Sequence, residues 1–285
     1  FKDMKIDYYF YSLIIISVFL FLLFFYWRKN RKIENIVQEY IRKTSTVTKA
    51  RVLSHFSKEV DEISLLISKI LILLNKYNLN NSDISEELPL NSAYHIMSKG
   101  NNSLMAVLEL SLSGYFWEPP IILRTAMEGF ATAWDIVHNP KRFDNWRTNK
   151  NFQSTKSITN YKEIDEKIGF LYGLLSQYYT HIGPKNSNQA IYMIGNTPIA
   201  QNFGFIPPGK EDIRKTEIYM LILVAYISLQ TTEICFHEYA NTYETVSKIP
   251  GELLMKAKVS ERHKIFADKA LSHFQQLSNN PLEKL

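Results

Sequence analysis

Residues 8–27 read YYFYSLIIISVFLFLLFFYW, a run of twenty residues without a charge. A helix rises about 1.5 Å per residue, so this run would extend about 30 Å, the thickness of the hydrocarbon core of a bilayer. Tyrosines open the run, and Tyr26 and Trp27 close it, as aromatic residues do at the two surfaces of a membrane. The pattern predicts a single transmembrane helix.

The charges that follow the run predict its orientation. Between Arg28 and Arg51 the chain has eight Lys or Arg and two acidic residues, whereas from Val52 onward it has 23 basic and 24 acidic residues. Basic residues collect on the cytoplasmic side of membrane helices. We therefore expect the N-terminus outside and a nearly neutral body in the cytoplasm. Anionic lipid is the expected partner of the basic segment, at about 1 kcal/mol per basic group near the surface.

Two other interpretations of residues 8–27 fit the sequence less well. A cleaved signal peptide carries its positive charge before the apolar run and small residues at a cleavage site after it. Lys2 and Lys5 before the run are offset by Asp3 and Asp7, and no cleavage site of small residues follows it. A core helix is rarely apolar on every face over such a length.

The rest of the chain shows helical periodicity and no internal repeat, which predicts an all-α fold. We expect residues 1–27 to form a short tail and the anchor, 28–51 a basic juxtamembrane helix or linker, and 52–285 one cytoplasmic helical bundle. The expected helices cover residues 33–41, 51–77, 92–116 with an interruption near Gly100, 118–138, a short piece of 142–160, 161–179, 212–246 and 252–277.

Two segments of the body have further expectations. Residues 190–194 and 202–206 lie in a stretch rich in Asn, Gly and Pro, and we expect them to pair as a small β-hairpin. Residues 218–229, IYMLILVAYISL, are apolar on nearly all faces, which favours the central helix of a bundle. A second transmembrane span is the alternative there, although the polar residues 230–233 cut it short.

The apolar helix 118–138 contains three charged residues on one stripe, Arg124, Glu128 and Asp135. Charges in such a helix are costly to bury unless they are paired or contact a ligand. One hypothesis is an internal Arg–Glu pair that fixes how two helices pack. The other is a polar functional site, with Arg124 and Glu128 as catalytic candidates and Asp135 as a binding candidate.

The stretch LYGLLSQYYTHIG, residues 171–183, is the second candidate region. Tyr172 and Ser176 lie on one helical face and are binding candidates. His181 lies at the expected helix end and is either a catalytic residue or a partner of the helix dipole.

A third candidate is the i,i+4 pair Glu233 and His237, which we treat as binding residues. Its spacing differs from the Glu-x-x-His motif of di-iron bundles and no second copy exists, so we predict no metal and no cofactor. Cys235 is the single cysteine of the chain, which excludes a disulfide framework and fits a reducing compartment. The chain has no phosphate loop, dinucleotide fingerprint or hydrolase motif.

The motif RTAME at 124–128, followed about fifty residues later by LYGLLSQYYTH, resembles the bacterial helical proteins of the domain-of-unknown-function 5677 family. The resemblance covers residues 92–246 and marks Arg124, Glu128, Ser176 and His181. Since that family has no established activity, the resemblance implies a site without a reaction. It also implies that the membrane is the bacterial inner (plasma) membrane.

A more distant similarity is to HEPN-type helical ribonucleases of toxin and phage-defence systems. Those enzymes need an Arg and a His a few residues apart on one helix. This chain has no such pair. Arg51 and His55 are too close together and lie beside the anchor, and Arg262 and His263 are adjacent, so the departure weakens the ribonuclease interpretation.

Two functional hypotheses follow. The first is a membrane-anchored binding or effector protein of stress or phage defence, which self-associates through its anchor and juxtamembrane helix. The alternative is a metal-independent ribonuclease or toxin effector that uses Arg124, Glu128 and His181. Nucleic acid is a partner only under the alternative, and the sequence leaves open whether the protein is an enzyme.

Overall fold

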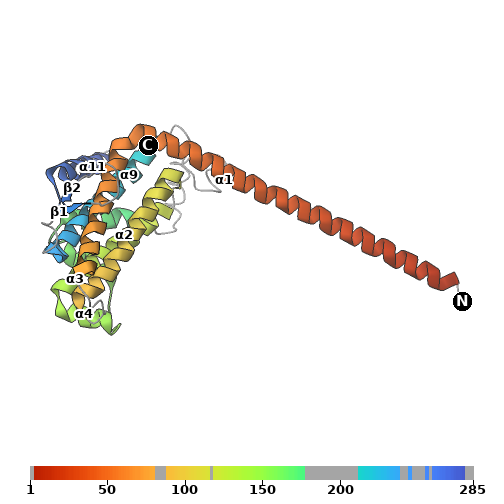
Figure 1. The fold of residues 1–285 in the computed structure, drawn as a ribbon, viewed down its shortest axis with the longest axis horizontal. Coiled ribbons are helices and arrows are strands. Elements are labelled where there is room, and N and C mark those ends of the chain that lie inside the picture. The colour runs from red at the N-terminus through yellow and green to blue at the C-terminus, as the bar shows by residue number, and fades with distance from the viewer. Residues whose placement is uncertain are drawn as a thin grey trace. The chain divides into compact units, whose positions relative to one another are not determined.

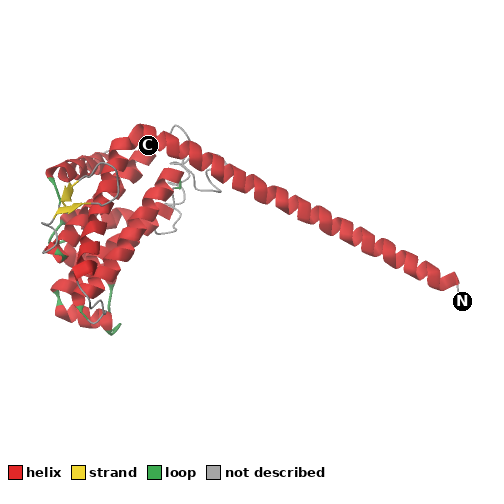
Figure 2. Cartoon of the chain, viewed as in Figure 1, coloured by secondary structure: helices red, strands yellow, loops and turns green. Residues whose placement is uncertain are grey.

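The computed structural model describes residues 3–80, 88–115, 118–176, 211–237, 243–245, 254–256 and 259–279. Within these ranges almost all of the chain is helical, so the predicted all-α class is confirmed (Figure 2). The elements are α1 (Asp3–Asn80), α2 (Pro89–Ser113), α3 (Glu118–His138), α4 (Pro140–Arg147), α5 (Ser154–Tyr161), α6 (Glu166–Leu174), α9 (Glu211–Cys235), β1 (Tyr243–Thr245), β2 (Leu254–Lys256) and α11 (Glu261–Asn279).

The chain divides into two compact units, residues 1–47 and 48–285, and α1 contributes to both. The helix break predicted between residues 41 and 51 is wrong. The hydroxyl of Thr46 donates to the Arg42 carbonyl at 2.9 Å, which satisfies this polar side chain within the helix. The backbone instead leaves helical geometry at Phe56 (φ −126°, ψ 26°), where two helices meet at a kink.

Helix α9 forms the centre of the second unit (Figure 1). Every residue from Ile218 to Ile227 is buried, and α9 contacts α2, α3, α6 and α11. By length and composition, Arg214–Cys235 could cross a membrane, yet 83% of its most apolar window is buried inside the unit. A helix that is apolar on all sides suits this position, so the prediction of a central helix is confirmed.

Helices α2 and α3 make the most extensive contact of the second unit. Helix α2 is continuous at Gly100, where an interruption was predicted. A Cβ atom at this position would lie 2.8 Å from Cε2 of Phe130 on α3, so the glycine allows the two helices to approach closely. The neighbouring Asn101 is buried, and its side-chain N and O atoms have no hydrogen-bond partner in the described structure.

The C-terminal part departs from the predicted helices. Helix α9 ends at Cys235 and not near residue 246, because Tyr243–Thr245 forms strand β1. This strand pairs antiparallel with β2, with Tyr243 opposite Lys256. Helix α11 then begins at Glu261, nine residues later than predicted. The hairpin predicted from residues 190–194 and 202–206 lies outside the described residues.

Two glycine substitutions test the close approach of α2 and α3. We expect Gly100→Ala to lower the free energy of unfolding by about 1 kcal/mol, because overpacking against the buried Phe130 ring costs about 1–3 kcal/mol and exceeds the gain in helix propensity. Gly173→Ala is the matched control, since its Cβ would meet nothing within 4 Å. It should stabilise the protein by up to about 1 kcal/mol. Denaturant unfolding in detergent, followed by circular dichroism, measures the free energy of unfolding of both variants. Equal changes in the two variants would contradict the close approach of α2 and α3 at Gly100.

Candidate functional site

Helix α3 carries all three charged residues of the predicted stripe, but it places them in two separate environments. Local sequence fixes the helix ends: Pro119 and Pro120 lie in the first turn, and α4 follows after Asn139. Arg124 and Glu128 lie in the half of α3 that faces α5 and α6. Asp135 lies nearer the end of α3, beside α4 and α5.

The first environment is the Arg124 cluster, which comprises Arg124, Glu128, Ser154 and Tyr172. Nε of Arg124 donates to Oε1 of Glu128 at 3.2 Å, and Nη2 of Arg124 donates to the Tyr172 hydroxyl at 2.8 Å. The Tyr172 hydroxyl donates to the same Glu128 oxygen at 2.9 Å. Ser154 donates to the other oxygen, Oε2, also at 2.9 Å. Three of the residues come from α3 and α6, and the fourth is the first residue of α5, so the cluster joins three helices.

The Arg124 cluster is accessible to solvent. The side chains of Arg124 and Glu128 are 26% and 24% exposed, and the guanidinium carbon lies 5.0 Å from the centroid of the Tyr172 ring. Burial raises the pKa of Tyr172, whereas its hydrogen bond from Arg124 acts in the opposite direction. The phenol is therefore a hydrogen-bond donor at neutral pH and not a base.

Glu128 orients the other members of the cluster. Its carboxylate accepts hydrogen bonds from Arg124, Tyr172 and Ser154, so it is held in one position by three donors. Each hydroxyl gives its single proton to Glu128, so of the three donors it is the partly exposed guanidinium that can recognise a further group. Arginine is a strong, geometrically defined donor to carboxylate and phosphate, so the arrangement suits a group with acceptor oxygens.

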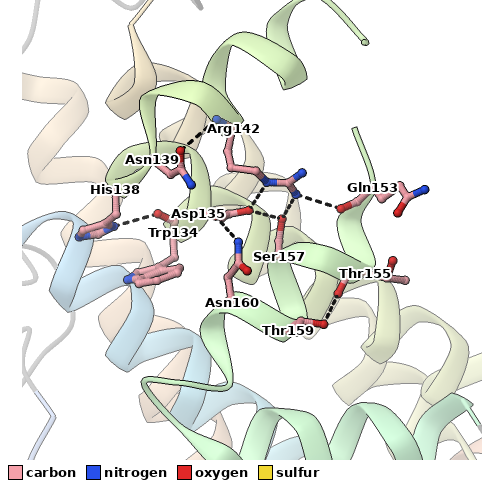
Figure 3. Close-up of polar contacts among 10 residues, drawn as sticks. All are labelled: Trp134, Asp135, His138, Asn139, Arg142, Gln153, Thr155, Ser157, Thr159 and Asn160. Carbon is pink, nitrogen blue, oxygen red and sulfur yellow. Dashed lines mark hydrogen bonds and ion pairs between the residues drawn. The ribbon is translucent and has the colours of Figure 1, made fainter. Parts of the chain in front are cut away.

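The second environment is the Asp135 network, shown in Figure 3. Oδ2 of Asp135 accepts from Nε of Arg142 at 2.6 Å and from the Ser157 hydroxyl at 2.8 Å. Oδ1 accepts from the Asn160 amide at 2.9 Å. Nη2 of Arg142 also donates to Ser157 at 2.9 Å and to the Gln153 carbonyl at 3.0 Å.

The Asp135 network is structural. The side chains of Asp135 and Arg142 are 2% and 11% exposed, and both carboxylate oxygens have partners within the protein. The guanidinium also lies over the Phe152 ring, 4.4 Å from its centroid. Asp135, predicted as a binding residue, is therefore a joint between α3, α4 and α5. Sequence reasoning missed Arg142, although the Asn139-Pro140 helix start that positions it was visible.

Glu233 and His237 belong to the end region of α9 and not to the Arg124 cluster. Oε2 of Glu233 accepts from the Val259 amide at 3.0 Å, and His237 is exposed beyond the end of α9. Ser176 is half-buried just beyond the end of α6. His181 lies outside the described residues, so its predicted catalytic role stays a prediction.

Buried groups near α9 are not reactive centres either. Burial raises the pKa of the Cys235 thiol, which suits a core residue and not a nucleophile. Nη1 of Arg214 donates to the Ser111 carbonyl at 2.9 Å and to Glu217 at 3.2 Å, so this pair ties α9 to the end of α2. Burial raises the pKa of Glu217 to about 8, while Arg214 acts to lower it. Within the described residues, no three His, Cys, Asp or Glu side chains are placed to hold a metal ion.

No family model, curated protein or solved structure matches this chain. The functional conclusion therefore depends on the geometry of the residues themselves.

Two arginine substitutions separate the structural pair from the candidate site. Arg142→Ala should lower the free energy of unfolding by about 3–5 kcal/mol, because it leaves the buried Asp135 carboxylate without its counter-charge. Arg124→Ala should cost about 1 kcal/mol or less, since its ion pair is partly solvated. Denaturant unfolding of the two variants measures the difference. The double variant Asp135→Ala/Arg142→Ala should lose less stability than the sum of the two single variants. If the changes in free energy of unfolding simply add, Asp135 and Arg142 are not paired.

Proposed function

We propose that this chain is a single-pass protein of the bacterial inner (plasma) membrane whose cytoplasmic helical body binds an oxygen-rich ligand group at the Arg124 cluster. The observation that carries the proposal is the cluster itself: the partly exposed guanidinium of Arg124 is held in place by Glu128 of α3 and Tyr172 of α6. The resemblance of residues 124–128 and 171–181 to the domain-of-unknown-function 5677 family adds to it.

The exposure of apolar side chains on α1 supports the membrane anchor. Leu20, Phe21, Leu22, Phe24 and Tyr26 are 52–67% exposed. At about 100° per residue, these positions span roughly two thirds of the circumference of the helix, more than one face. A soluble partner covers one face of a helix, whereas lipid covers every face. A bilayer is therefore the partner that suits this segment, in contrast to α9, whose apolar surface is covered by its own unit.

Preorganisation supports binding at the Arg124 cluster. A free arginine side chain loses rotamer freedom when it captures a ligand, which weakens binding. Here the bonds to Glu128 and Tyr172 have already fixed the guanidinium. Glu128 neutralises one positive charge, so the site selects ligands through directed hydrogen bonds more than through net charge. In this proposal the protein is a sensor or effector of stress or phage defence, and it self-associates through its anchor.

Membrane fractionation tests the anchor. The wild-type chain should stay in the membrane pellet after alkaline extraction. Leu20→Arg/Phe24→Arg should move to the soluble fraction, because each arginine costs about 2.5–3.5 kcal/mol at the centre of a membrane helix. Val47→Arg is the matched control, since Val47 is equally exposed but lies outside residues 8–27. A wild-type chain that extracts like the double variant would refute the anchor.

Ligand-dependent stability tests the binding site. We expect inorganic phosphate or citrate to raise the unfolding temperature of the detergent-solubilised wild-type chain, because a ligand that binds only the folded state stabilises it. Arg124→Ala should lose this shift. Arg147→Ala should keep it, since Arg147 is an exposed arginine of α4 whose guanidinium pairs with the exposed Asp144. The same shift in all three proteins would show that the anion acts elsewhere.

Induced expression in bacteria separates binding from the ribonuclease alternative. Total RNA should remain intact in cells that express the wild type, Arg124→Ala and His181→Ala at equal membrane levels. RNA cleavage by the wild type, lost in both variants, would replace the binding proposal with the ribonuclease.

A further inference from the structure

A further polar cluster joins α11, the last helix that the structure describes, to α1. This Glu62 cluster comprises Glu62 and Lys69 of α1 and Arg262 and His263 of α11. Oε1 of Glu62 contacts Nδ1 of His263 through a short hydrogen bond, and Oε2 of Glu62 accepts from Nε of Arg262 at 2.9 Å. Glu62, Lys69 and His263 are all buried. About 200 residues separate the two sides, so the contact is purely tertiary.

A second ion pair lies beside the cluster. Nζ of Lys269 donates to Oε1 of Glu59 at 2.8 Å, and it lies 5.6 Å from the Tyr219 ring of α9. Glu59 and Glu62 are one helical turn apart, so two carboxylates of α1 hold the basic side of α11. Among the described side chains of α11, Ala267, Ala270 and Phe274 are buried, and Phe266 and Leu271 pack against the same core. The ion pairs add polar contacts to this apolar docking.

The neighbours of His263 determine which of its ring nitrogens carries the proton. Since Nδ1 faces a carboxylate acceptor, the neutral ring carries its proton there and donates it to Glu62. The second ring nitrogen, Nε2, is buried and has no hydrogen-bond partner in the described structure. A proton added at Nε2 would place a charge where no acceptor receives it. Such a charge is costly in a buried position.

The charged groups around His263 come from three helices. Helix α1 supplies Glu62 and Lys69, α11 supplies Arg262, and Glu233 of α9 interacts with Lys69. Burial lowers the pKa of His263, and the two cations reinforce this effect, whereas Glu62 opposes it. The pKa of Lys69 is also lowered by burial. The docked cluster thus favours the neutral imidazole.

The pKa of His263 differs between the docked and the released state of α11, and this difference sets how docking depends on pH. A released His263 has the ordinary pKa of about 6.5, and a docked one has a lower pKa. Above the ordinary value both states are neutral and docking has its full strength. As the pH falls below it, the released state binds protons more readily, so docking weakens.

We propose that α11 is an acid-releasable clamp on α1, opened when His263 takes up a proton at Nε2. The device is independent of the ligand proposed for the Arg124 cluster. Release would uncover Glu62 and the adjoining face of α1.

Hydrogen exchange of the full chain in detergent tests the clamp. Exchange of α11 amides is compared with that of α3 amides at about pH 7.5 and about pH 5.5, after correction for intrinsic rates. In the wild type the ratio of α11 to α3 exchange should rise at the lower pH, by at most about tenfold, which is the limit that an ordinary histidine pKa of about 6.5 sets for the fall from about pH 7.5 to about pH 5.5. An unchanged ratio would overturn the proposal.

Substitutions assign the effect to His263. His263→Asn keeps an amide donor near the Nδ1 position but cannot take up a proton, so its exchange ratio should be the same at both pH values. His138→Asn, at an exposed histidine of α3, is the matched control and should respond like the wild type. A pH response of His263→Asn equal to that of the wild type would overturn the proposal. If His263→Asn already loses α11 protection at about pH 7.5, the same comparison is made with His263→Gln. An exchange ratio that does not change with pH would support the proposal, and a pH response equal to that of the wild type would overturn it.

Discussion

A helix that is apolar on every side must be covered on every side, and this requirement of α9 organises the second unit. Helices α2, α3, α6 and α11 all turn apolar faces toward it. Polar side chains of these helices pair with neighbouring helices, those of α3 with α4, α5 and α6 and those of α11 with α1. The Arg124 cluster, the Asp135 network and the Glu62 cluster are three outcomes of that arrangement, and they differ mainly in how much water reaches them.

Access to water separates a candidate site from a structural joint more clearly than residue type does. Each cluster contains an arginine paired with a carboxylate. At Asp135 the donors come from two short helices and seal the pair, which leaves nothing for a ligand to recognise. At Glu128 about a quarter of each charged side chain of the ion pair stays in contact with solvent. Identical chemistry therefore has a structural role in one place and suits recognition in the other.

Local signals were sufficient where the structure depends on neighbours in sequence. Helix α3 has the predicted bounds because prolines and Asn139 fix both of its ends. The pairing of Arg124 with Glu128 follows from their i,i+4 spacing. Sequence could not reveal Arg142 as the partner of Asp135, because a turn lies between them. Sequence also could not predict the contact of Glu62 with His263, because the two residues are about 200 positions apart and meet only when the whole bundle has folded.

The shared carboxylate of Asp135 has a dynamic consequence. Helices α4 and α5 have eight residues each, too few for an isolated helix to persist in water. Both donate to one carboxylate of α3, so loss of that contact would loosen the two helices together. Ser154, the first residue of α5, also donates to Glu128. Local unfolding of this small segment would therefore remove one donor from the Arg124 cluster while leaving the centre of the bundle intact.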